Sequence, residues 1–219
     1  MSNTLGHNRN EADLSRRDFL RSSGAAAATA AVLAEAPAAL AEEAADKNAV
    51  KAIGPQPVKL TLDVNGADMT TTIEPRVTLL DALRNYLDVT GCKRVCDRGT
   101  CGACTVMMDG KPVYSCTMLA LEAEGKKIKT AESLIDGGKL DAVPAAFAKY
   151  DAQQCGFCTP GFVVAMHAAF HANPQALDKK PPTPAEIEEA LSGNICRCGT
   201  YQQMRDAIAA LCNQQKKGG

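Results

Sequence analysis

The stretch CDRGTCGACTVMMDGKPVYSC, residues 96–116, holds four of the ten cysteines in a chain of 219 residues. Its first three cysteines follow the spacing C-x4-C-x2-C, and the fourth comes after the turn signal Asp109-Gly110. This is the plant-type spacing for a 2Fe-2S cluster, which needs four thiolates from a chain that curls around two irons. Gly99 and Gly102 would let backbone amides approach the sulfurs. The predicted ligands are Cys96, Cys101, Cys104 and Cys116.

Zinc or a pair of disulfides is a weaker interpretation of this first set. A four-cysteine zinc ribbon would prefer two C-x2-C pairs, which this half of the chain lacks. Cys92 lies close to the set, but its x3 gap to Cys96 breaks the plant-type spacing. We therefore expect Cys92 not to be a ligand.

A second set of cysteines follows in QCGFCTPG and GNICRCGTY. It contributes a C-x2-C pair, Cys155 and Cys158, and a C-x-C pair, Cys196 and Cys198. By spacing alone, four such thiolates suit a zinc ion as well as a second 2Fe-2S cluster, and both interpretations remain open.

The first half of the chain shows strand signals around one helix. Residues 58–64 alternate apolar and polar side chains, Asn65-Gly66 favours a hairpin turn, and the return strand is expected at about 69–73. TLLDALRNYLD, residues 78–88, has helical periodicity, with Leu79, Leu83 and Leu87 on one face beside Leu80, and a capping box from Thr78 to Asp81. A second hairpin around 109–110 and a strand in KKIKT complete a small mixed sheet over residues 57–131.

The second half, residues 132–213, reads as helical, and residues 214–219 as a tail. Helical patterns cover GFVVAMHAAFHAN, PAEIEEALSGN and YQQMRDAIAALCN. Thr183, Pro184 and Glu186 together mark one helix start. His167 and His171 lie one turn apart, but the sequence indicates no third ligand, so ordinary helix residues are the favoured interpretation.

The first 41 residues predict an export signal. SRRDFL places two arginines ahead of an Ala-rich run from Gly24 to Ala34, which is too short and too weakly apolar to span a bilayer. We expect a twin-arginine signal peptide over residues 1–41, cleaved after Ala41, and a linker over residues 42–56. Proteins that leave the cytoplasm already folded and loaded can keep thiols that would otherwise form disulfides, which explains ten cysteines in a periplasmic protein.

Composition excludes several classes of function. A formal net charge of -1, 4% aromatic residues and no tryptophan argue against a nucleic-acid partner. There is no glycine fingerprint of a nucleotide-binding fold. The histidines are scattered and the cysteines are grouped as ligands, so no residue of this chain is predicted to be catalytic.

DRGTCGACTV, QCGFCTPGF and GNICRCGTY, in this order, resemble the small iron-sulfur subunit of the xanthine oxidase family of molybdenum hydroxylases. The resemblance covers residues 58–211 and is strongest to the subunit of bacterial periplasmic aldehyde oxidoreductases, with isoquinoline and nicotinate oxidoreductases as near relatives. CRCGTY in place of the commoner CRCTGY points to the isoquinoline and periplasmic aldehyde branches rather than to xanthine enzymes. Val95 departs from the family's usual glycine before the first ligand.

The resemblance implies an α+β fold, with a plant-ferredoxin-like β-grasp domain followed by an all-α four-helix domain. It implies a second 2Fe-2S cluster on Cys155, Cys158, Cys196 and Cys198. It also implies that Gln154 contacts the pterin of a partner chain and that Cys198 is the ligand nearest to it. Electrons would pass from molybdenum through the pterin to this cluster, and then to the first cysteine set.

We expect the chain to be the electron-transfer subunit of a periplasmic molybdenum-dependent aldehyde oxidoreductase. Its partners would be a large subunit with molybdenum-pterin, as the cytosine dinucleotide, and an FAD subunit or a cytochrome acceptor. One alternative is the subunit of an N-heterocycle hydroxylase. A free-standing exported ferredoxin and a zinc-binding structural module are the rivals from other classes.

Overall fold

The computed structural model describes residues 53–171 and 181–218, without the side chains of residues 215–218. The predicted signal peptide, most of the predicted linker and the segment 172–180 lie outside the described residues. From Ile53 onward, the described residues belong to one compact unit. Among them, no helix combines the length and the apolar character that a membrane crossing requires.

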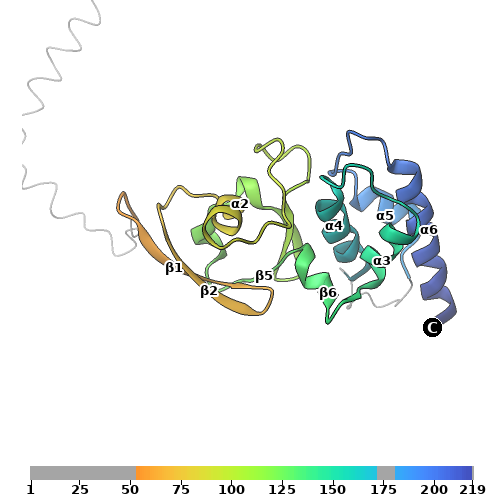
Figure 1. Cartoon of the computed structure of the whole chain (residues 1–219), viewed down its shortest axis with the longest axis horizontal. Helices are drawn as coiled ribbons and strands as arrows, with labels where there is room; N and C mark the ends of the chain where they lie inside the picture. Colours follow the sequence, from red (N-terminus) through yellow and green to blue (C-terminus); the bar gives the residue numbers. More distant parts are fainter. Residues whose placement is uncertain (1–52, 172–180, 219) are drawn as a thin grey trace, which may run out of the picture. The chain divides into compact units, whose positions relative to one another are not determined.

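Five strands form a mixed sheet in the first half of this unit (Figure 1). In the order β2-β1-β5-β3-β4, β1 pairs antiparallel with β2 and parallel with β5, and β3 pairs antiparallel with β4 and β5. The bounds are β1 Val58–Val64, β2 Ala67–Ile73, β3 Thr105–Met108, β4 Lys111–Tyr114 and β5 Lys127–Lys129. Both predicted hairpins and the KKIKT strand are confirmed. Asn65 and Asp109 take positive φ values of 56° and 49°, as the first residue of a tight two-residue hairpin turn requires.

One helical segment lies on a face of this sheet (Figure 1). It begins as α2, Leu79–Asp81, and continues as a π-helical turn, η2, Ala82–Tyr86. The leucines predicted on its apolar face are buried and pack in one cluster with the sheet leucines Leu60 and Leu62. The Thr78 hydroxyl accepts a hydrogen bond from the Asp81 amide at 3.1 Å, which confirms the predicted cap. The π-helical geometry of η2 was not predicted.

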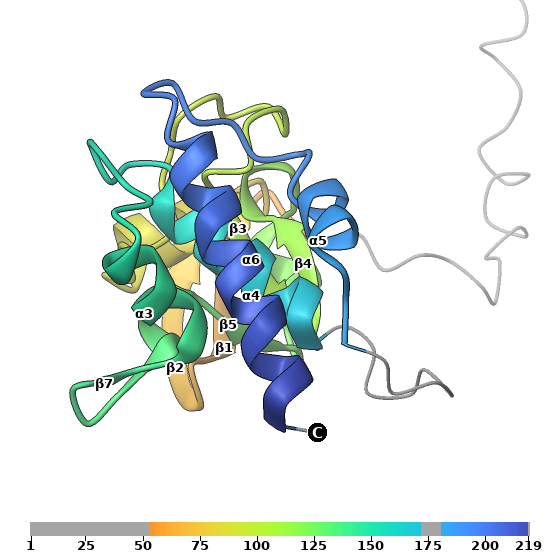
Figure 2. The ribbon, with the colours of Figure 1, turned by 90° about the vertical axis from the view of Figure 1, so that its right-hand side faces the viewer.

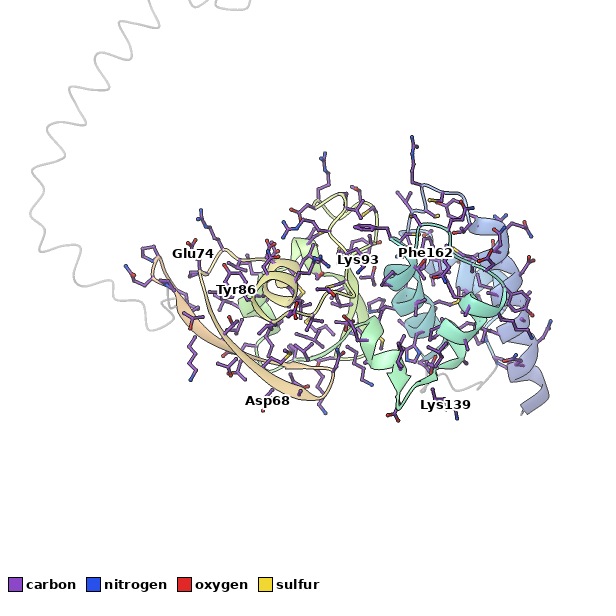
Figure 3. The ribbon with its side chains drawn as sticks, viewed as in Figure 1. Asp68, Glu74, Tyr86, Lys93, Lys139 and Phe162 are labelled. Atoms are coloured by element: carbon purple, nitrogen blue, oxygen red, sulfur yellow. The ribbon has the colours of Figure 1, made fainter. Side chains whose placement is uncertain are left out.

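Short 3-10 turns and a small hairpin lead into the second half. The turns are η3 Ser115–Thr117, η4 Ala120–Ala123 and η5 Ala131–Leu134. The hairpin pairs β6, Ile135–Asp136, with β7, Lys139–Leu140, and Lys139 is labelled on it in Figure 3. Its turn uses Gly137 and Gly138, both at positive φ. The sequence analysis missed this hairpin because two-residue strands carry too little alternation to be recognised.

Four described helices form the rest of the unit. They are α3 Ala142–Lys149, α4 Thr159–His171, α5 Pro184–Ala190 and α6 Tyr201–Gly218. α3 and α5 each contact both α4 and α6 (Figure 2). At the start of α5, the Glu186 carboxylate accepts from the Thr183 amide at 2.6 Å, and the Thr183 hydroxyl accepts from the Glu186 amide at 3.4 Å. The predicted helix start is therefore confirmed as a capping box.

Candidate metal centres

The first predicted ligand set is assembled by one loop and the β3–β4 hairpin. Three of its cysteines lie on the loop between η2 and β3, and Cys116 lies in η3, directly after β4. Gly99 and Gly102 have φ values of 72° and 68°, a left-handed conformation that few other residues adopt. These two turns curl the loop, and the hairpin brings Cys116 back to it.

The four thiols of this set meet in two pairs. Cys96 lies beside Cys101 and Cys104 beside Cys116, close enough for each pair of side chains to affect one another's pKa. The Gly99 amide donates to the Cys116 sulfur at 3.3 Å, and the Thr100 amide donates to the Cys96 sulfur at 3.4 Å. Amides that point at sulfur stabilise the thiolate form, which is the form that binds metal.

The thiols of the first set differ in pKa. Hydrogen bonding by Thr100 is the main reason that the pKa of Cys96 falls from 9.0 to about 6. Burial, followed by the hydrogen bond with Cys104, raises the pKa of Cys116 to about 11. The pKa of Tyr114 is raised by burial and then by the charges of all four cysteines.

The second predicted set joins two loops at the ends of helices. Cys155 and Cys158 precede α4, and Cys196 and Cys198 lie between α5 and α6. Here too the thiols lie in pairs whose members affect one another's pKa, Cys155 with Cys198 and Cys158 with Cys196. Cys196 is buried, whereas Cys155 and Cys198 are exposed. One pair of the second set therefore lies at the protein surface.

The two thiols of the less exposed pair differ in pKa, and Thr200 acts on one of them. Burial raises the pKa of the Cys158 thiol to about 12. Burial also acts to raise the pKa of Cys196, but hydrogen bonds, first among them that of the Thr200 side chain, outweigh it and lower this pKa to about 7. The Thr200 hydroxyl lies 3.2 Å from the Cys196 sulfur.

Neither set is gathered as closely as a single zinc ion would require. Four thiolates around one zinc have sulfur-sulfur distances of about 3.8 Å, since each zinc-sulfur bond is about 2.3 Å. Among the described residues, the one trio of potential ligand atoms within 4.8 Å of one another belongs to Asp141, His167 and His171. No three thiols of either set are that close, whereas two thiol pairs suit two irons.

Direct hydrogen bonds connect the loops that carry the two sets. The Ile195 amide donates to the Cys101 carbonyl at 3.0 Å, next to the ligand position Cys196. The Asn194 side-chain amide donates to the Gly102 carbonyl, also at 3.0 Å. The Tyr114 hydroxyl donates to the Gly193 carbonyl at 3.1 Å. We call this contact between residues 101–105 and 193–195 the inter-loop junction.

Glycines make this close approach possible. A Cβ on Gly102 would lie 2.8 Å from the Gly193 carbonyl oxygen, and one on Gly161 would collide with the Gly102 carbonyl. A Cβ on Gly193 would collide with the Tyr114 hydroxyl. Backbone atoms and the side chains of Asn194 and Tyr114 therefore fill the junction, and no space remains for a side chain at these three glycines.

Comparison with known proteins agrees with this architecture. The 2Fe-2S iron-sulfur cluster binding domain family matches residues 62–134, the 2Fe-2S binding domain family matches residues 130–209, and the twin-arginine translocation signal family matches residues 13–33. The aldehyde oxidoreductase iron-sulfur-binding subunit PaoA of Escherichia coli is 37% identical over 219 aligned residues, which cover 96% of this chain and 93% of that protein.

The chain belongs to the iron-sulfur subunits of the molybdenum hydroxylases. The nicotine 6-hydroxylase small subunit of Paenarthrobacter nicotinovorans is 44% identical over 69% of this chain and 87% of its own length. The structure of quinoline 2-oxidoreductase from Pseudomonas putida 86 matches with a TM-score of 0.66 and 39% identity, over 74% of this chain and 98% of that one. That of the aldehyde oxidoreductase from Desulfovibrio desulfuricans matches with a TM-score of 0.65 and 33% identity, over 73% of this chain and 17% of that longer one.

As such a subunit, the chain is an electron-transfer protein of an oxidoreductase complex, and the predicted β-grasp and helical domains are confirmed as a fold. Its twin-arginine signal directs it to the periplasm. Gln154 is exposed, beside the exposed Cys155. Cys92 is buried at 2% exposure, and burial is the main reason that its pKa rises to about 12.

Sequence reasoning missed the residues that support the two sets. Asn194, Tyr114 and Thr200 are ordinary polar residues in the sequence, and their partners lie elsewhere in the chain or depend on a loop conformation. Asp141 was also missed as a neighbour of His167. The GNIC motif did contain one usable signal, since Asn194 lies two residues before Cys196 and its side-chain amide offers two donors.

Proposed function

We propose that this chain carries electrons between a molybdenum centre and an acceptor in a periplasmic enzyme that oxidises aldehydes to carboxylic acids. Two 2Fe-2S clusters, when bound, supply one-electron transfer. Cys96, Cys101, Cys104 and Cys116 would hold one of them, and Cys155, Cys158, Cys196 and Cys198 the other. The observation that supports this proposal most strongly is that both sets present their thiols as two pairs.

The surface position of Cys155 and Cys198 supports an order of transfer. A pair that a partner subunit can approach is suited to receive electrons, and Gln154 beside it is suited to contact the partner's pterin. The first set would then pass electrons on, because the inter-loop junction joins its loop to that of the second set. The partners would be a large subunit with molybdenum-pterin cytosine dinucleotide, and an FAD subunit or a cytochrome.

Aldehydes are the proposed substrate class because the similarity to PaoA extends over nearly the whole length of both proteins. The N-heterocycle hydroxylase alternative rests on relatives that match a smaller share of the chain, such as the nicotine enzyme subunit. We further propose cleavage after Ala41, with the ferredoxin-like domain over residues 57–131 and the helical domain over residues 132–213.

Metal and sulfide analysis with electron paramagnetic resonance tests the cluster assignment. We expect about four irons per chain and two distinct signals after dithionite reduction, as two 2Fe-2S clusters require. Zinc on the second cysteine set, with about two irons, would contradict the proposal. A chain that purifies without any molybdenum-containing partner and still transfers electrons would favour a free-standing ferredoxin.

The intact complex tests the substrate class. Its rate with an artificial electron acceptor should be measured with aromatic or aliphatic aldehydes and, separately, with N-heterocycles of similar size. We expect turnover with aldehydes. Turnover with heterocycles alone would replace the aldehyde proposal by the alternative without affecting the electron-transfer role.

A further inference from the structure

Three potential metal ligands outside the cysteine sets meet at the end of α4. His167 and His171 lie one turn apart on this helix, and their ring centroids are 4.3 Å apart. Asp141, the residue that caps α3, places its Oδ1 3.3 Å from His167 Nδ1. One ligand atom from each of the three side chains lies within 4.8 Å of the other two. The third ligand that the sequence did not indicate is therefore supplied by the chain 26 residues before His167.

This arrangement differs from an ordinary His-Asp ion pair. The pKa of His167 is lowered, first by burial and then by the charge of His171, in spite of the Asp141 carboxylate. The imidazole is therefore neutral near neutral pH, and a neutral imidazole is the form that binds metal. The two imidazole rings are tilted by 47° to each other, and one ligand atom from each ring lies within 4.8 Å of the carboxylate.

The site has space for a water ligand. A cavity of about 290 Å³ reaches Asp141 and His167, and a second cavity of about 160 Å³ reaches Asp141 and His171. His171 is exposed, and His167 retains 15% exposure of its side chain. An ion can therefore reach the three side chains from solvent, and water can complete its coordination.

The ligand chemistry selects the ion. Two imidazole nitrogens and one carboxylate oxygen are a borderline donor set, suited to zinc and its neighbours in the first transition row. Magnesium and calcium prefer sites made of oxygen alone. A set of three protein ligands with one open position is the arrangement of many four-coordinate zinc sites.

We propose that Asp141, His167 and His171 form a binding site for one zinc ion, with water as the fourth ligand. The bound ion would join the residue that caps α3 to the last turn of α4. It would also fix the end of the β6–β7 hairpin, which precedes Asp141 and carries the labelled Lys139 (Figure 3). This site is separate from the two cysteine sets and does not depend on the electron-transfer role.

Zinc titration of the chelator-treated complex, with its iron-sulfur centres in place, tests the proposal by calorimetry. We expect one zinc per chain at this site and no comparable binding of magnesium. His171→Gln removes the exposed ligand and should weaken zinc binding at least ~10-fold, since the loss of a mere outer-sphere partner already costs about that much. Asp141→Asn should weaken it too, and it keeps the helix cap, because Asn caps as well as Asp.

Two lysine variants act as a matched pair. Lys129 lines the same cavity as Asp141 and His167, so its charge would repel a cation there, and Lys129→Gln should tighten zinc binding. Lys149 lies at the far end of α3, and Lys149→Gln should leave the affinity unchanged. If neither single variant, Lys129→Gln nor Asp141→Asn, changes the affinity for zinc, the proposed site is wrong.

X-ray absorption spectroscopy at the zinc edge identifies the atoms that bind the ion and their distances from it. At the proposed site we expect nitrogen and oxygen neighbours at about 2.0–2.1 Å and no sulfur neighbour at about 2.3 Å. Sulfur neighbours would place the zinc on cysteines and refute the proposal, whatever the stoichiometry. Iron content measured in every variant shows that the fold and the clusters are retained.

Discussion

The Asn194 side-chain amide donates a hydrogen bond to the carbonyl oxygen of Gly102 across 3.0 Å. Asn194 is buried at 6% exposure, and the same amide lies 3.5 Å from the Thr105 hydroxyl. The loop with the C-x-C cysteines is therefore held directly against the loop with the C-x4-C-x2-C cysteines.

Asn194→Ala should destabilise the protein by about 1–3 kcal/mol, because it removes a buried hydrogen-bond donor from the inter-loop junction. We also expect altered paramagnetic resonance signals, since both cysteine-bearing loops lose a constraint. Asn85→Ala is the matched control: Asn85 is exposed and hydrogen-bonded to Asp81 at 3.2 Å, so its loss should change stability by less than about 0.5 kcal/mol. Equal effects of the two substitutions would contradict a special role for Asn194.

Gly161→Ala should destabilise the protein, although helix propensity alone predicts a gain of about 1 kcal/mol. The new Cβ would collide with the Gly102 carbonyl oxygen and lie 3.0 Å from the Ala103 Cα. Such overpacking costs about 1–3 kcal/mol or more. Denaturant unfolding gives the sign directly, and a stabilised variant would show that α4 has free space at this point.

Thr200→Val should lower the reduction potential of the cluster on the second cysteine set. The Thr200 hydroxyl lies 3.2 Å from the Cys196 sulfur, and a hydrogen bond to a ligand sulfur favours the more negative, reduced cluster. Thr200→Ser keeps the hydroxyl and should keep the potential. A redox titration followed by paramagnetic resonance measures both, and an unchanged potential in Thr200→Val would argue against Cys196 as a ligand.

Cys92→Ala should leave about four irons per chain, whereas Cys96→Ala should lose about two. Cys92 is buried in the apolar cluster below the loop, and its sulfur faces the Val89 carbonyl at 3.9 Å. Its removal should cost only about 1 kcal/mol of stability. Loss of iron in Cys92→Ala would show that Cys92 replaces one of the four predicted ligands.

The elements that were predicted correctly are those encoded by neighbouring residues. The β1–β2 hairpin follows from alternation and Asn65-Gly66, and the start of α5 follows from Thr183, Pro184 and Glu186. The motifs likewise indicated which cysteines group into two sets, and their role as ligands stays a prediction. In each of these cases the signal lies within a few consecutive residues.

Features that depend on distant residues were not predicted. Asn194 and Gly102 are 92 positions apart, and the fold alone brings them together. The same holds for Asp141 and His167, which lie 26 positions apart. Which thiols lie beside each other within each set also depends on loop conformation, and the spacing of the cysteines in the sequence does not determine it.

The hydrogen bond from Ile195 to Cys101 uses only backbone atoms, while the Ile195 side chain is 52% exposed. Side-chain scanning would therefore pass over this position, because almost any residue supplies the same amide. Proline is the exception, since it has no N–H to donate. Any residue other than proline at position 195 can thus keep the connection between the two loops. Only a substitution by proline would reveal that this position matters.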